Sequence, residues 1–67
     1  MTKTEQATIM ESASILRMES RNYYDIYKHN NDSKNATLYN QSLLAYEKYQ
    51  QLNKIAAELD IIAGGNL

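Results

Sequence analysis

The chain of 67 residues is divided in two by eight consecutive polar residues, which read Lys-His-Asn-Asn-Asp-Ser-Lys-Asn at positions 28–35. Asn and Asp favour turns because their short side chains hydrogen-bond to nearby backbone groups, and Asn tolerates the left-handed conformation that often ends a helix. This segment predicts a turn at about 30–35. Asn30 or Asn31 would end one helix, and Asp32, Ser33 or Asn35 would cap the next.

The residues before the turn predict an amphipathic helix from about residue 3 to residue 30. The chain contains no Pro, and Thr2 followed three residues later by Glu5 is the pattern of a capping box. The apolar positions are spaced by four and three residues in turn, as in a heptad repeat, with Ser20 as the one polar interruption. These positions are Ile9, Ala13, Leu16, Tyr23 and Tyr27.

The residues after the turn predict a second helix from about residue 36 to residue 63, with Gly64 and Gly65 as its C-cap. One heptad seam runs along it, formed by Leu38, Ala45, Tyr49, Leu52, Ala56, Leu59 and Ala63. Two long helices joined by a short turn predict an all-α fold, an antiparallel two-helix hairpin, as one domain over residues 1–67. The position of the turn places Tyr27 near Tyr39.

Both helices carry more apolar residues than a two-helix hairpin can bury. A second row lies beside the seam and consists of Ile15, Ile26, Leu44, Ile55 and Ile62. A domain of about 60 residues is marginally stable, and this chain has no Cys for disulfides or thiolate zinc sites. Contiguous apolar area of this kind usually marks an interface. We therefore expect a homodimer in which two hairpins form a four-helix bundle through this row, with a different protein as the alternative cover.

Tyrosine is the only aromatic residue, with six Tyr and no Phe or Trp. Tyr combines a large contact area with a hydroxyl that tolerates water, and it is enriched at protein interfaces. Tyr23, Tyr27 and Tyr49 fall on the seams and are expected in the core. Tyr24, Tyr39 and Tyr46 lie off the seams, so we expect them to contact a larger protein partner.

Basic residues form one edge of the first helix, where Arg17, Arg21 and Lys28 accompany Tyr24 at helical spacing. We include this edge in the partner-binding surface. Such a row could also contact RNA, which makes a dimeric RNA-binding regulator the alternative function. The overall charge disfavours nucleic acid, because seven Lys and Arg are balanced by eight Asp and Glu and the isoelectric point is about 5.7.

The sequence offers no constellation for catalysis, for a cofactor or for a metal ion. It has no glycine-rich phosphate loop, no nucleophile elbow and no Glu-x-x-His pair of a di-iron bundle. The single histidine, His29, falls in the last turn of the first helix, where a cation interacts favourably with the helix dipole. We therefore expect a protein that is not an enzyme, without cofactor or small-molecule substrate.

The expected function is that of a small protein–protein interaction module that regulates or inhibits a larger protein. Asn, Tyr, Lys and Ile are abundant, which is typical of AT-rich coding DNA and favours a phage or mobile-element protein that acts on a host or defence protein. A small virion or scaffold subunit is a further alternative. No secretory signal or membrane span is recognisable, so we expect a cytoplasmic protein, in the host cytoplasm if it is phage-encoded.

Overall fold

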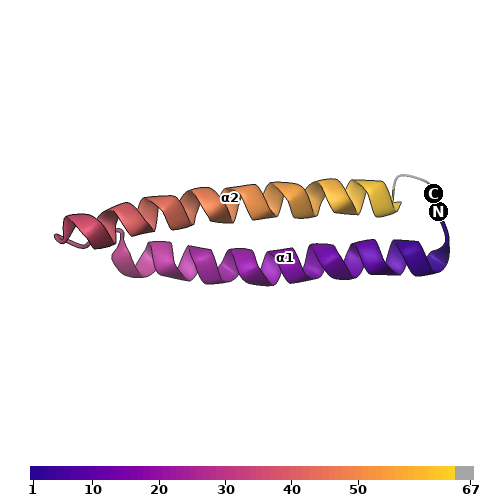
Figure 1. Ribbon diagram of the computed structural model, residues 1–67, viewed down its shortest axis with the longest axis horizontal. Coiled ribbons are helices and arrows are strands. Elements are labelled where there is room, and N and C mark those ends of the chain that lie inside the picture. Colours follow the sequence, from indigo (N-terminus) through magenta and orange to yellow (C-terminus); the bar gives the residue numbers. More distant parts are fainter. Residues whose placement is uncertain (65–67) are drawn as a thin grey trace.

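The computed structural model describes residues 1–64, which form two long helices packed side by side in opposite directions (Figure 1). Helix α1 spans Lys3–Asn30 and helix α2 spans Ala36–Gly64. The hairpin is narrow and long, with extents of 51 × 14 × 12 Å. The predicted all-helical hairpin is confirmed.

The start of α1 has the predicted capping box. The Glu5 backbone N–H donates to the Thr2 hydroxyl, and the Thr2 N–H donates to the Glu5 carboxylate, each over 3.0 Å. The two contacts satisfy donors that a helix start otherwise leaves without partners. The hydrogen bond from the Thr2 backbone is the main reason that the pKa of Glu5 lies below its usual value of 4.5, and the contact with the Thr2 side chain adds to it.

The capping box predicts a pH-dependent part of the stability. Folding favours the ionised Glu5, so its contribution is complete above pH 4.5 and is lost as the pH falls through the lowered pKa. We expect Glu5→Ala to lower the melting temperature at about pH 6, and this deficit to shrink towards about pH 3. Circular dichroism melts measure both values. Glu11→Ala, beyond the first turn of the same helix, is the control, and an equal pH dependence in the two variants would contradict the assignment.

The end of α1 differs from the prediction of a left-handed Asn. Asn31 has φ −67° and ψ −21°, and no residue other than Gly has a positive φ among residues 1–64. The Asn31 N–H still donates to the Tyr27 carbonyl over 2.9 Å, and the Ser33 N–H donates to the Asn30 carbonyl over 3.1 Å. The chain therefore leaves the helix through right-handed backbone, and the Tyr27 and Asn30 carbonyls have partners without a left-handed residue.

Helix α2 is capped by Asn35, which is one of the three residues predicted for this role. Its side-chain oxygen accepts the N–H of Thr37 over 2.9 Å and that of Leu38 over 3.3 Å. At the other end, Gly64 of the predicted Gly64–Gly65 cap is the last residue of α2 and has no positive φ. Gly65, the second residue of that predicted cap, lies outside the described residues.

The core between the helices is made almost entirely of small side chains. Leu52 is the one large apolar residue that is buried, at 8% exposure. Ser20 and Ser42 are buried beside the alanines, and Ser42 is a seam position that the sequence analysis left out. Its hydroxyl donates to the Tyr39 carbonyl over 2.6 Å. The buried alanines are Ala13, Ala45, Ala56 and Ala63.

The pairing of the helices differs from the prediction by two turns of α2. Tyr27 packs on Tyr46, with ring centroids 4.6 Å apart, and not on Tyr39. Further along, the Ser20 hydroxyl donates to the Asn53 side-chain oxygen over 2.9 Å. The cause lies at the turn, where α2 begins beyond the end of α1 (Figure 1). This overhang leaves Tyr39 exposed.

Candidate functional site

Two opposite faces of the hairpin carry groups of large side chains outside the core. Ile15 and Ile26 are 11 residues apart, which places them within about 20° of each other around α1. On α2 the same spacing separates Leu44 from Ile55, and Ile62 lies five whole turns beyond Leu44. We call these five residues, all exposed by more than a third, the isoleucine face.

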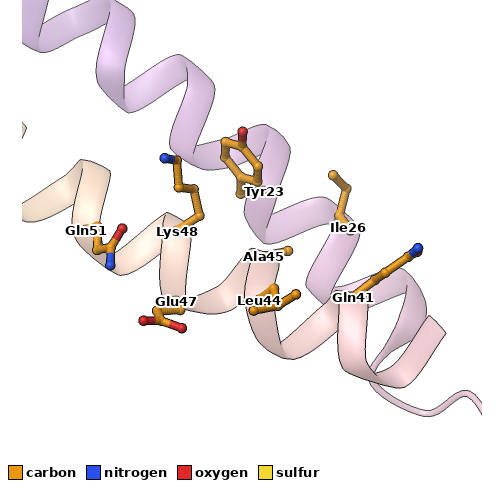
Figure 2. Close-up of a pocket in the computed structure, with 8 residues that line it drawn as sticks. All are labelled: Tyr23, Ile26, Gln41, Leu44, Ala45, Glu47, Lys48 and Gln51. Carbon is orange, nitrogen blue, oxygen red and sulfur yellow. The ribbon is translucent and has the colours of Figure 1, made fainter. Parts of the chain in front are cut away.

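A groove on the isoleucine face shows that its α1 and α2 residues lie on the same side of the molecule. Ile26 of α1 and Leu44 of α2 line it together, and its volume is about 530 Å³ (Figure 2). Tyr23 and Ala45 form part of the lining near the core. The remaining lining residues are polar and come from α2: Gln41, Glu47, Lys48 and Gln51.

The opposite face carries four tyrosines in mutual contact, which we call the tyrosine face. Tyr24 lies two residues before Ile26, and Tyr46 lies two residues after Leu44, a rotation of about 200° in each helix. Tyr24 contacts Tyr27 and Tyr49 at centroid distances of 5.9 and 4.9 Å. Tyr46 contacts the same two rings at 4.6 and 5.8 Å. Each ring therefore has two neighbours, and the rings are tilted as aromatic pairs prefer.

The tyrosine face brings together residues that the sequence analysis had separated. Tyr24 and Tyr46 were expected at an interface, whereas Tyr27 and Tyr49 were expected in the core. Tyr27 and Tyr49 are half-buried and hold the two exposed rings in place. In the sequence, Tyr27 and Tyr49 follow Tyr24 and Tyr46 by three residues, a spacing that makes them neighbours on a helix surface. Only the pairing of the two helices decides which rings meet across them. Tyr39 is not part of this ring of contacts.

The basic residues beside the tyrosine face differ in the contacts that they make within the hairpin. Arg17 forms an ion pair and hydrogen bond with Asp60 of α2. Lys28 places its ammonium 5.9 Å from the centre of the Tyr24 ring, a cation–π distance. Arg21 lines a hollow of about 200 Å³ beside the tyrosines, together with Arg17, Ser20, Tyr49 and Asn53. Both arginines therefore border this recess, and Arg17 is the one that is paired with Asp60.

Two further observations concern ligands and membranes. Among residues 1–64, no three side chains of His, Cys, Asp or Glu come together as a metal site. Within the same range, neither helix combines the length and apolar character that a membrane span needs.

Comparison of the chain with known proteins identified no relative. No family model matches the chain, and neither the curated proteins nor the solved structures gave a match.

Proposed function

We propose that this chain is a non-enzymatic protein–protein interaction module, which forms a homodimeric four-helix bundle and binds a larger protein through its tyrosine face. The observation that carries the proposal is the imbalance between core and surface. The single hairpin buries one leucine among alanines and serines, while five large aliphatic side chains line one exposed face.

The core of one hairpin gives little hydrophobic stabilisation. Complete burial of a Leu or Ile side chain contributes about 1.5–3 kcal/mol, and an Ala side chain contributes far less. The isoleucine face therefore holds more apolar side chain than the buried core. A second hairpin placed on this face would convert exposed isoleucines into core, as in a four-helix bundle.

The dimensions of the hairpin suit a stable dimer. The full side of a hairpin of 51 × 14 Å corresponds to about 700 Å² on each copy. Two copies would bury about 1,400 Å² in total, which lies within the 1,200–2,000 Å² of stable protein interfaces. A dimer through the isoleucine face would leave both tyrosine faces on the outside.

The tyrosine face supports binding of a larger protein. Exposed Tyr and Arg are the residues that most often dominate binding energy at protein interfaces. The contacts among the four rings hold Tyr24 and Tyr46 in place before any partner arrives, which lowers the entropic cost of binding. Arg21 and Lys28 beside them favour a partner surface that is apolar with acidic groups at its edge.

In biological terms, the proposed role is regulation or inhibition of that partner. A phage or mobile-element protein that acts on a host or defence protein fits the residue composition. The RNA-binding alternative has weaker support, because Arg17 already has Asp60 as its partner. The alternative of a virion or scaffold subunit requires assemblies larger than a dimer in size-exclusion chromatography.

Photo-crosslinking in the cell that expresses the chain tests this function. A benzophenone amino acid at Tyr24 or at Tyr46 should give an adduct with the same larger protein, because both positions share one face. Met18, exposed on the outer side of α1, is the control position and should not give that adduct. With the purified partner, Tyr46→Ala should weaken binding roughly tenfold or more.

The outcomes separate the candidate functions. Adducts with RNA, and binding that falls steeply with salt, would support the RNA alternative over the protein partner. Identical protein adducts from Met18 and from the tyrosine positions would contradict a specific tyrosine face.

A further inference from the structure

We infer that the two hairpins of the dimer lie with their turns at the same end, so that α1 of each copy packs on α2 of the other. This inference rests on the proposed dimer and adds the geometry of its isoleucine-face contact. The observations that carry it are the order of apolar and charged residues along the face and the location of its groove.

The isoleucine face is organised in levels along the hairpin. Ile26 and Leu44 line one groove and so lie close to each other along the hairpin. Ile15 and Ile55 are each 11 residues further from the turn, about 16 Å along their helices, so they form a second apolar level. The face therefore presents two apolar levels, each with one residue from each helix, and Ile62 of α2 lies beyond them at the end away from the turn.

A polar level separates the two apolar levels. On α1 it contains Glu19, seven residues from Ile26 and hence on the same side of the helix. On α2 it contains Lys48 and Gln51 and, towards the outer edge, Glu47, all three of which line the groove. Within residues 1–64 the only ion pair is Arg17–Asp60, so Glu19 and Lys48 are not paired with each other inside one hairpin.

Two face-to-face arrangements with twofold symmetry exist, and they differ in which helices meet. If the turns are at opposite ends, α1 packs on α1 and α2 packs on α2. The two Glu19 carboxylates would then approach each other, as would the two Lys48 ammonium groups. If the turns are at the same end, α1 packs on α2 of the other copy. Each Glu19 then lies level with Gln51 of the other copy, and Lys48 is three residues, about 4.5 Å, nearer the turn. The second arrangement is favoured because it brings each Glu19 near a Lys48 and not near a second Glu19, and like charges at an interface are unfavourable.

The apolar levels match in this arrangement without any sliding. Ile26 of one copy faces Leu44 of the other, and Ile15 faces Ile55. Leu44 protrudes, with 67% of its surface exposed, beside the groove of about 530 Å³. At the same level, the groove of the other copy can receive it as a knob enters a hole. The four-tyrosine clusters then lie at the same end of the bundle, on its two outer sides.

Distance measurement between the two turns tests the arrangement. The chain has no Cys, so Lys34→Cys in the turn gives one unique site for a spin label. Pulsed electron paramagnetic resonance should give a distance below about 30 Å, because neighbouring helix axes lie only 8–10 Å apart. With the turns at opposite ends, the distance would approach the hairpin length of 51 Å.

The possible results separate this inference from the proposed dimer. A short distance supports the same-end arrangement. A distance near 50 Å overturns the arrangement and leaves the dimer intact. Loss of any dipolar signal, with a monomer in sedimentation equilibrium, overturns the dimer itself.

Charge variants give an independent second test. In the same-end arrangement, Glu19→Lys lies near Lys48 and should weaken dimerisation roughly tenfold, as should Lys48→Glu. The double variant restores opposite charges and should recover the original dimer affinity. Unchanged affinity in both single variants would overturn the inferred contact. With the turns at opposite ends, position 19 meets position 19 and position 48 meets position 48, so each contact has like charges both before and after the substitution.

Discussion

Replacement of Leu52 by alanine is expected to remove a large part of the free energy of unfolding at room temperature. Leu52 is the only large apolar side chain that is buried among residues 1–64, whereas Ile9, Leu16 and Leu59 on the seams are half-buried. Truncation of a buried Leu to Ala costs about 2–5 kcal/mol. Stability of about 0.05–0.15 kcal/mol per residue leaves a chain of this length with a total of similar size.

Urea unfolding followed by circular dichroism measures this effect. Leu43→Ala is the matched control, because Leu43 lies on the same helix and is 47% exposed. The control should change the free energy of unfolding by less than about 1 kcal/mol. Equal losses for the two leucines would mean that the seam of α2 is not the core of the folded unit.

Replacement of Ile55 by lysine is expected to abolish the dimer and, with it, much of the stability. Ile55 is 45% exposed in one hairpin and lies in the middle of the isoleucine face. A lysine there would bring an unpaired ammonium into an apolar contact, where desolvation is costly. We expect dimer affinity to fall roughly a hundredfold or more, which corresponds to about 2.7 kcal/mol.

Two measurements follow the dimer in this variant. The melting temperature of the unmodified chain should rise with protein concentration, and this dependence should disappear in Ile55→Lys. Sedimentation equilibrium should then give the mass of one chain, 7.7 kDa. Ile61→Lys is the control, since Ile61 is 69% exposed outside the isoleucine face. If both variants remained dimeric, the dimer would use another surface.

The two faces have different energetic roles in this proposal. The isoleucine face supplies the burial that the alanine-rich core lacks, so substitutions there should lower stability and dimer affinity together. The tyrosine face stays on the outside of the bundle. Substitution of Tyr46 should therefore weaken partner binding with a smaller effect on folding, and this contrast distinguishes the two surfaces experimentally.

The amino-acid sequence alone was sufficient to predict the helices and the turn. The polar segment at 28–35 and the capping pair Thr2 and Glu5 act through local hydrogen bonds, which depend on near neighbours in the chain. The heptad spacing likewise predicts the buried side of each helix, except near the turn, where the seam residue Leu38 is 39% exposed and Ser42 is buried. The prediction failed locally at Asn31, because several backbone conformations can end a helix and the sequence does not choose among them.

Only the tertiary structure decided how the two helices are aligned and which side chains meet. The overhang of α2 at the turn shifts the pairing, so Tyr27 meets Tyr46 and Tyr39 is left outside the ring of contacts. Heptad spacing repeats every seven residues, so a shift by one repeat presents the same kind of side chain at every position. The periodic pattern that predicts the helices therefore cannot determine their alignment, which depends on the geometry of the turn and on contacts such as Ser20 with Asn53.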